Sequence, residues 1–208
     1  MLRRLQNRSR AVLNSYRSTV DVLAGAPVEL AYVSDGDANG VFYYIGTNGL
    51  RDAWTNPHTA GRITASASPS IIQGSIEELV DRTNNTVHTG QNFNSNYFRF
   101  DLGASRTLLL KSFSWRQRSD SGDTQPISLY VYGSNDASNW YLINKYNTGS
   151  KSVTGYALTG GTASLWNNVT VAAPGTYRYI QFYSNVNNIN AGYLTAGEVE
   201  LYGTLYVT

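Results

Sequence analysis

Apolar residues near the N-terminus recur at helical spacing. Between Leu2 and Leu23 they fall three or four positions apart on one stripe, arginines occupy the opposite face, and Gly25 followed by Pro27 ends the pattern. An isolated helix of this length is marginal in water, so residues 1–25 are predicted to form a basic amphipathic arm that docks on the body or on a partner. The residues expected to carry this docking are Arg3, Arg4, Leu5, Arg8, Val12, Leu13, Tyr16, Arg17 and Val20.

After Pro27 the pattern changes from helical spacing to alternation of apolar and polar residues, which is typical of strands with one buried face. Turn-forming clusters recur between the alternating stretches, and composition shows no second break. Residues 26–208 are therefore predicted to form one antiparallel β-sandwich. The expected strands are Val41–Gly46, Arg62–Ala67, Tyr97–Leu102, Thr107–Trp115, Ile127–Tyr132, Trp140–Tyr146, Thr176–Tyr183 and Glu198–Tyr206.

Alternation also predicts which face of a strand enters the core. In Tyr97–Leu102, the residues Phe98, Phe100 and Leu102 share one face, and we expect that face to be buried. Several strands place tyrosines on the other face, and two interpretations stay open for them: ordinary packing on a pleated surface, or a contact face for a partner. These outward tyrosines include Tyr130, Tyr132, Tyr179 and Tyr183.

Composition supports a β-rich protein without disulfides. Charged residues make up 14% of the 208 positions, whereas the chain has 19 glycines and 16 tyrosines, a balance that suits turns and strands. No cysteine is present, so the body must be held by packing and hydrogen bonds. The net charge of +2 is concentrated in residues 1–25, which leaves the body nearly neutral and gives no reason to expect nucleic acid as a ligand.

Neither a signal peptide nor a membrane span is expected from the hydropathy pattern. The basic N-terminal residues lack the continuous apolar run of a secretory signal. Nowhere do about 18 apolar residues follow one another, as a membrane-spanning helix requires. The chain is therefore predicted to be soluble and not secreted by a signal peptide.

Five segments, in order, resemble the discoidin or coagulation-factor type C family, whose fold is a galactose-binding-like jelly roll. The resemblance spans about residues 39–203 and implies an all-β sandwich in which Trp140 returns to the core. The missing cysteine pair resembles intracellular, bacterial and viral members, and the helical arm is an addition to the domain. The segments are NGVFYYIGTNG with WTNP, ELVDR, NYFRFDLG, LYVYGSNDASNW, and RYIQFY followed by EVELYG.

Catalytic chemistry is not expected. The two histidines, His58 and His88, lie in polar stretches rich in Thr and Asn, where a solvated imidazole is the ordinary case. Few histidines and no cysteine argue against a zinc site. The GDANG and GTNG motifs lack the strand-to-helix context of a phosphate-binding loop, so we interpret them as turns. The chain is predicted to be a binding protein rather than an enzyme.

A structural calcium ion is the one cofactor that the sequence leaves open. Asp35, Asp37 and Asn39 have oxygen-bearing side chains at alternate positions, and Asp120 and Asp123 lie in a Gly/Ser stretch. No glutamate follows at the position that an EF-hand loop would require. We expect no other cofactor.

Ligand recognition is expected in loops. In the resembling family, ligands meet loops clustered at one end of the sandwich, and residues 46–58 and 115–126 are similar to those loops. Their planar charged and amide groups suit sugar hydroxyls, and an aromatic ring suits the apolar side of a pyranose, although Trp54 is open to a second interpretation as a core residue. The candidates are Arg51, Asp52, Trp54, Asn56, Arg116, Arg118 and Asp120.

A third stretch, residues 184–197, is rich in asparagine and nearly uncharged. Its polar side chains are suited either to glycan binding or to capping their own turns, and the sequence favours neither. Its candidate ligand-binding residues are Asn187, Asn188 and Tyr193.

The arm and the sandwich together suggest a part of a larger assembly. By resemblance to small adhesion and decoration proteins of tailed phages, we expect a non-catalytic virion protein of the tail or fibre apparatus, assembled in the host cytoplasm and anchored by residues 1–25. Its expected partners are other virion proteins, further copies of itself and a cell-surface glycan. The alternatives are a capsid decoration protein and a free carbohydrate-binding lectin.

Overall fold

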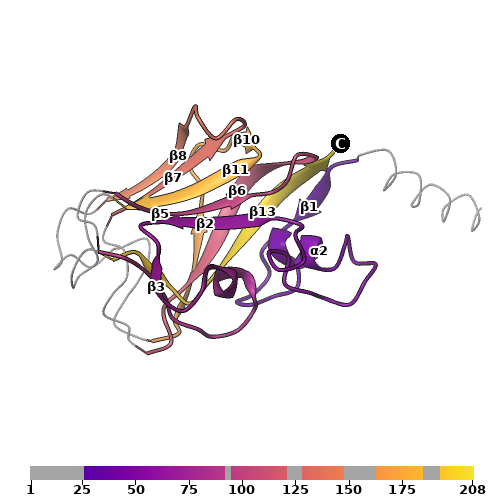
Figure 1. The fold of residues 1–208 in the computed structure, drawn as a ribbon. Helices are drawn as coiled ribbons and strands as arrows, with labels where there is room; N and C mark the ends of the chain where they lie inside the picture. The colour runs from indigo at the N-terminus through magenta and orange to yellow at the C-terminus, as the bar shows by residue number, and fades with distance from the viewer. Residues whose placement is uncertain (1–25, 92–94, 121–127, 148–162, 185–192) are drawn as a thin grey trace, which may run out of the picture.

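A computed structural model describes residues 26–91, 95–120, 128–147, 163–184 and 193–208, which form two stacked antiparallel sheets (Figure 1). The predicted arm, residues 1–25, lies outside the described residues. The first sheet contains, in spatial order, β1 (Val28–Leu30), β13 (Glu198–Val207), β6 (Arg106–Arg116) and β10 (Thr176–Tyr177), and β9 (Trp166–Thr170) also pairs with β6. The second contains β2 (Thr64–Ser68), β5 (Asn96–Asp101), β11 (Tyr179–Ser184), β7 (Ser128–Ser134) and β8 (Tyr141–Asn147).

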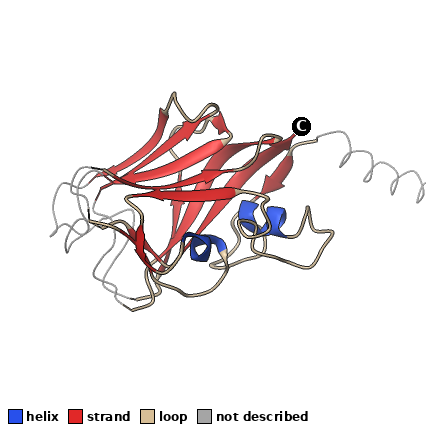
Figure 2. Cartoon of the chain, viewed as in Figure 1, coloured by secondary structure: helices blue, strands red, loops and turns tan. Residues whose placement is uncertain are grey.

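A third, smaller sheet lies at one end of the sandwich. It contains β12 (Thr195–Ala196), β4 (Val87–Thr89) and β3 (Ile71–Gln73) in that order. The described helices are short, namely α2 (Val41–Gly46) and the 3-10 helix η1 (Ile76–Val80), so strands dominate the molecule (Figure 2). The expected all-β sandwich is confirmed. No helix in the described parts of the chain is long and apolar enough to cross a membrane.

The core lies between the two large sheets and is built from aromatic rings. Phe182 of β11 lies 4.9 Å from Phe113 and 5.6 Å from Trp115 of β6, measured between ring centroids, with edge-to-face geometry. Phe98 and Phe100 of β5 are fully buried beside them. The predicted core face of this strand is therefore confirmed, because its residues alternate between buried and half-buried positions.

Residues 41–46 were expected to form a strand, and this prediction is wrong: they form α2. Val41, Phe42 and Ile45 share one helix face and are all buried. In a strand, the neighbours Val41 and Phe42 would point to opposite faces, and one face could not reach the core. The backbone N–H groups of Phe42 and Tyr43 donate to the carboxylate of Glu200 at 2.8 and 3.2 Å. This tertiary cap stabilises the first turn and overrides the β propensity of the sequence.

The single strand expected at residues 176–183 is divided between the two sheets. Its first part, β10, pairs with β6, and its second part, β11, pairs with β5 and β7. Arg178 lies at the crossing, where its guanidinium donates two hydrogen bonds of 2.7 Å to Asp101, and its backbone N–H donates to Asn135. The chain thus changes sheets at a residue whose polar groups are satisfied by the second sheet.

Trp140 was expected to return to the core, and this prediction is also wrong. Its ring is half-buried, and the Arg99 guanidinium lies over it at 4.6 Å from the ring centroid. Its Nε1 donates to the carbonyl of Ala137 at 3.2 Å, and its neighbour in the second sheet is Tyr179. Trp140 therefore covers the outer face of that sheet rather than its inner face.

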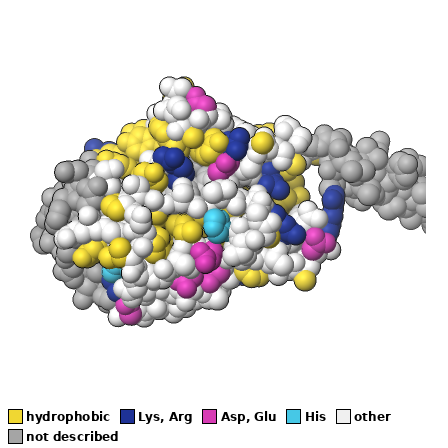
Figure 3. Space-filling model, viewed as in Figure 1, with side chains coloured by type: hydrophobic (Ala, Val, Ile, Leu, Met, Phe, Trp, Pro, Cys, Tyr) yellow, Lys and Arg dark blue, Asp and Glu magenta, His cyan; other side chains and the backbone are white. Residues whose placement is uncertain are grey.

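The outward tyrosines of the second sheet contact one another. Tyr130 and Tyr132 stack at 6.3 Å between ring centroids, and Tyr183 meets both edge-on. Lys145 lies over the Tyr130 ring at 5.3 Å. Figure 3 shows hydrophobic side chains over the sheet that contains β7 and β11. These rings are half-buried and pack on one another, as aromatic side chains do on a pleated strand surface.

Candidate functional site

The small third sheet holds a histidine in its middle strand. His88 of β4 faces Thr195 of β12 on one side and Gln73 of β3 on the other. It is 8% exposed, and its Nε2 atom is buried without a hydrogen-bond partner. Tyr193 lies just before β12, and its ring centroid is 5.4 Å from the ring centroid of His88. Two aromatic rings, one from β4 and one from the segment before β12, are thereby placed side by side.

A charged pair lies next to these rings, just after the end of β6. Arg118 binds the carboxylate of Asp120 through Nε and Nη2, the second contact measuring 2.6 Å. The Arg118 side chain is 11% exposed and that of Asp120 is 45% exposed, so the carboxylate is the accessible partner. This fork-to-fork geometry fixes both planar groups in one orientation.

Hydrogen bonds from two other segments hold Asp120 in place. The Thr86 hydroxyl donates to its Oδ1 at 2.8 Å, and the Gln73 amide approaches its Oδ2 at 3.4 Å. The backbone N–H of Ser119 donates to the carbonyl of Asn85 at 3.1 Å. We call the set formed by Gln73, Thr86, His88, Arg118, Asp120 and Tyr193 the Arg118 site.

In the Arg118 site, Arg118 and Asp120 are charged and His88 is neutral. Burial lowers the pKa of His88, and the nearby Arg118 cation lowers it further, so the imidazole is neutral at pH 7. Hydrogen bonds from Arg118 hold the pKa of Asp120 well below its usual range. The site therefore offers a carboxylate, a guanidinium, a hydroxyl, an amide and an aromatic surface, which are groups suited to binding polyhydroxylated ligands.

Solved structures of carbohydrate-binding modules share this architecture. A CBM32 module from a family 31 glycoside hydrolase of Clostridium perfringens superimposes with a TM-score of 0.54 at 18% identity, covering 69% of this chain and 92% of that one. Another C. perfringens CBM32 module, solved in complex with GalNAc-β-1,3-galactose, gives 0.53 at 14% identity, covering 68% and 96%. The chain has the discoidin-like jelly-roll fold, of the galactose-binding-like kind.

Sequence relatives are much larger proteins. The E3 ubiquitin-protein ligase hecd-1 of Caenorhabditis elegans is 34% identical over 190 residues, which cover 87% of this chain and 7% of the ligase. The E3 ubiquitin-protein ligase Ufd4 of Drosophila melanogaster is 26% identical over 175 residues, covering 81% and 6%. The chain thus spans less than a tenth of the length of these relatives. No protein-family model matches it.

Within the discoidin-like fold, three of the residues predicted to bind ligand come together, namely Arg118, Asp120 and Tyr193. Arg116 lies nearby but is otherwise engaged, because its guanidinium lies over the Trp166 ring at 5.2 Å and its Nε donates to the carbonyl of Ser164. Asn187, Asn188 and Asp123 lie outside the described residues.

The loop at residues 46–58 lies at the other end of β6 from residues 115–120, which are the described part of the second predicted loop, so the two do not meet there as expected. Arg51 shares a cavity with Arg106, the first residue of β6, whereas Arg118 follows the last residue of that 11-residue strand. Figure 1 accordingly shows α2 and β3 on opposite sides of the molecule. The length of β6 therefore separates the 46–58 loop from residues 117–120.

Side chains of the 46–58 loop have structural contacts of their own. Asn56 accepts the backbone N–H of His58 at 2.9 Å and donates to the carbonyl of Glu77 at 2.9 Å, so it closes a turn. Asp52 lies 3.7 Å from Arg62. Trp54 is half-buried, and it packs so closely on Gly46 that a Cβ there would lie 2.7 Å from its Nε1. Trp54 therefore packs against the start of this loop without belonging to the buried core.

Asp35 and Asp37, which the sequence suggested as calcium ligands, accept hydrogen bonds from residues of their own loop. Asp37 accepts the backbone N–H groups of Val33 and Asn39 at 2.7 and 3.0 Å, and Asp35 accepts the Tyr32 hydroxyl at 2.9 Å. In the parts of the chain that the structure describes, no group of three or more His, Cys, Asp or Glu side chains could hold a metal ion.

Gln73, Thr86 and His88 belong to the Arg118 site but were not among the predicted ligand-binding residues, and His88 is the most informative of the three. The polar neighbourhood suggested a solvated loop, but Val87–Thr89 forms a strand with all three residues buried. The run Thr86, Val87 and Thr89 around the histidine is rich in β-branched residues, and this signal could have indicated a strand. The pairing that buries His88 involves Thr195, which alternation within one segment does not reveal.

Proposed function

We propose that this chain is a non-catalytic glycan-binding module and that the Arg118 site is its sugar-binding surface. The observation that carries the proposal is the convergence of the Arg118–Asp120 pair with the His88 and Tyr193 rings. The fold supports the same function, because its solved neighbours include a module in complex with GalNAc-β-1,3-galactose.

The chemistry of the site suits a pyranose ring. Sugar hydroxyls both donate and accept hydrogen bonds, so an accessible carboxylate beside a guanidinium can engage two neighbouring hydroxyls at once. The half-buried Tyr193 offers an apolar surface for the C–H face of the sugar. A neutral His88 adds no charge beside an uncharged ligand, and Thr86 and Gln73 hold Asp120 in a fixed orientation.

The decisive experiment is titration of the full chain with galactose and with N-acetylgalactosamine by calorimetry, repeated for Asp120→Asn and Asp52→Asn. Asp120→Asn should weaken binding roughly tenfold or more, because it removes a charge-assisted acceptor. Asp52→Asn makes the same chemical change in the loop at the opposite end and should leave affinity unchanged. Equal loss in both variants, or no saturable binding of either sugar, would refute the proposal.

A recognition role also fits the sequence relatives. In the E3 ligases hecd-1 and Ufd4 the matching stretch is 7% and 6% of the protein, as expected for one recognition module within a larger chain. Ligase activity is a property of those proteins, and we do not extend it to this chain.

We further propose, from the sequence alone, that the glycan-binding module works within a phage virion, in the tail or fibre apparatus or as capsid decoration, and assembles in the host cytoplasm with other virion proteins and copies of itself. The support is the basic amphipathic pattern of residues 1–25. Light scattering of the full chain and of a chain beginning at Pro27 tests it. An oligomer that becomes monomeric without the arm supports assembly, whereas two identical monomers favour a free lectin.

A further inference from the structure

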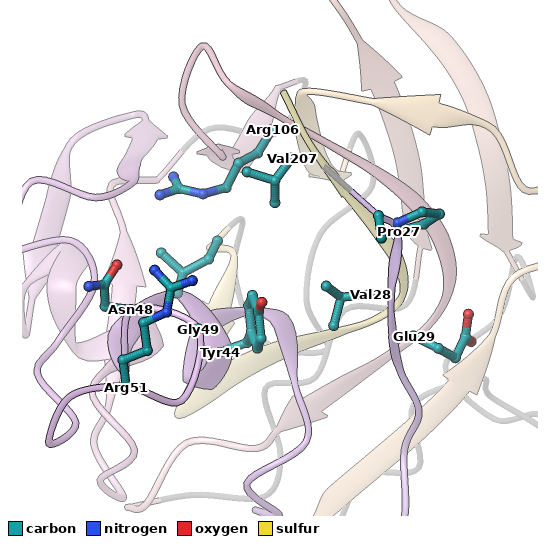
Figure 4. A pocket seen from close by; sticks show the side chains of 11 residues that line it. Pro27, Val28, Glu29, Tyr44, Asn48, Gly49, Arg51, Arg106 and Val207 are labelled. Carbon is teal, nitrogen blue, oxygen red and sulfur yellow. The ribbon is translucent and has the colours of Figure 1, made fainter. Parts of the chain in front are cut away.

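A second candidate binding site lies at the opposite end of the molecule from the Arg118 site. A cavity of about 430 Å³ opens between β1, α2 with the loop that follows it, and the ends of β6 and β13 (Figure 4). This volume is in the range of pockets that hold small organic molecules. The sequence suggests Arg51, at its rim, as a glycan-binding residue, but the proposed glycan site does not include this cavity and assigns no role to it.

The cavity is largely apolar along one wall. Val28 of β1, Tyr44 and Ile45 of α2, and Val207 of β13 line it, and Figure 4 shows Val28, Tyr44 and Val207 facing the same space. These residues come from three elements that are fixed by the fold, because β1 pairs with β13 and Ile45 is buried in the core. The wall is therefore formed before any ligand arrives.

Two arginines bring positive charge to this apolar space. Arg51, from the loop after α2, and Arg106, from the start of β6, both place their guanidinium groups at the cavity (Figure 4). Nη1 of Arg106 donates to the backbone carbonyls of Arg62 and Leu102 at 2.9 and 2.8 Å. Among the described residues, neither Arg51 nor Arg106 has a carboxylate within ion-pair distance.

Nearby acids are engaged elsewhere. Glu29 also lines the cavity, but its carboxylate binds Lys111 and the Thr204 hydroxyl, each at 2.7 Å. Asp52 lies 3.7 Å from Arg62, a third cation of the same region. Arg106 is half-buried, and a guanidinium in such a place without a counter-ion is unfavourable. An anion that entered the cavity would therefore be stabilised by Arg106 and attracted by the exposed Arg51.

We propose that this cavity binds a small organic carboxylate with an apolar body. The carboxylate lies between the guanidinium groups of Arg51 and Arg106, whose fork geometry matches its two oxygens, and the apolar body packs against Val28, Tyr44 and Val207. The Asn48 side chain, at the same rim, supplies a further hydrogen-bonding group. This site is independent of the proposed glycan site, so the failure of either leaves the other intact.

The test titrates the full chain with phenylacetate while backbone amide signals are followed by NMR. Phenylacetamide, which has the same shape without the charge, and inorganic phosphate, which has charge without an apolar body, are titrated in parallel. Signals of Val28, Gly49 and Val207 should shift with phenylacetate, and those of His88 should not. Phenylacetate should bind at least tenfold more tightly than either comparison compound.

Two variants locate the charge requirement. Arg51→Gln should weaken phenylacetate binding by roughly tenfold, and because Arg51 is exposed, the fold should be unaffected. Lys145→Gln removes an exposed cation on the second sheet and should leave binding unchanged. The proposal is overturned by equal losses in both variants, by equal affinity for phenylacetate and its amide, by phosphate binding as tightly as phenylacetate, or by no saturable shifts at Val28, Gly49 and Val207.

Discussion

The carboxylate of Glu200 accepts the backbone N–H of Phe42 at 2.8 Å, across 158 positions of sequence. The same carboxylate accepts the N–H groups of Tyr43 and Leu201, so the last strand caps the first turn of α2 and satisfies donors that a helix start leaves free. Gly40 makes this approach feasible, because a Cβ at that position would lie 2.0 Å from the Glu200 carboxyl carbon.

Gly40→Ala should therefore separate α2 from its cap. We expect a loss of about 2–3 kcal/mol in the free energy of unfolding, since the added methyl group forces the buried carboxylate away from its donors. Urea denaturation measures it. Gly61→Ala is the control: Gly61 has a φ of +67° and open space around it, so only backbone strain of about 1 kcal/mol is expected. If both variants lost the same free energy of unfolding, the Glu200 side chain would move aside at little cost and the predicted role of Gly40 would be wrong.

The buried carboxylates of β13 make stability fall as pH rises from about 4.5 to about 8. Burial and the neighbouring Glu200 raise the pKa of Glu198 to about 8, and burial raises that of Glu200 to about 7 even though backbone N–H groups oppose the shift. Both values exceed the ordinary 4.5, so the folded chain holds more protons than the unfolded chain. Its free energy of unfolding must then decrease as pH rises through these values.

Urea denaturation at about pH 6.5 and at about pH 8.5 checks this prediction. His88 acts in the opposite direction, because its lowered pKa reduces stability only as pH falls below the ordinary value of 6.5. Glu198→Gln should flatten the decrease between the two pH values, since the amide does not titrate. An unchanged slope in this variant would mean that other groups cause the decrease.

The sequence predicts an element well when the element's own pattern of apolar residues determines which side chains are buried. It predicts poorly when contacts with distant residues decide the structure. β5 alternates strictly between buried and half-buried residues because one face meets the core, so Phe98 could be placed from pattern alone. In β11 the apolar Ile180 and Phe182 also share the buried face, although Gln181 between them is buried as well. α2 could not be placed from pattern alone, because its cap comes from Glu200 at the far end of the chain. The break at Arg178 was equally hidden, since the residues on both sides of it have strand-forming character.

The same distinction applies to the candidate site. Arg118, Asp120 and Tyr193 could be proposed because charged and aromatic residues in loops suggest recognition. His88 could not, because its burial comes from pairing with Thr195. Sequence also does not state at which end of a sandwich a loop emerges, and this is why Arg51 was grouped with the wrong partners.

The ion pair at the sheet crossing should contribute more than a typical surface pair. Arg178→Ala removes two hydrogen bonds of 2.7 Å to Asp101, and both side chains are less than one-third exposed. We expect a loss of about 1–2 kcal/mol in the free energy of unfolding. Lys111→Ala, which breaks the pair with Glu29 between half-exposed side chains, should cost at most about 0.5 kcal/mol. Comparable losses in the two variants would contradict a special role for the crossing.

The last prediction concerns the two faces of β11. Phe182 is fully buried and contacts the rings of Phe100, Phe113 and Trp115, so Phe182→Ala should leave a cavity between the sheets and cost about 3–5 kcal/mol. Tyr183, the next residue, points outward and packs on other tyrosines.

Tyr183→Ala should therefore cost about 1 kcal/mol, because only the mutual packing of half-buried rings is lost. Urea denaturation of the two variants at one pH gives the comparison, and an unchanged denaturant dependence would show that both still unfold in one cooperative step. If Tyr183→Ala cost as much as Phe182→Ala, the outer tyrosine face would act as a second core. Tyr183 would then be a structural residue, and its substitution could not be used to test whether the second sheet binds a ligand.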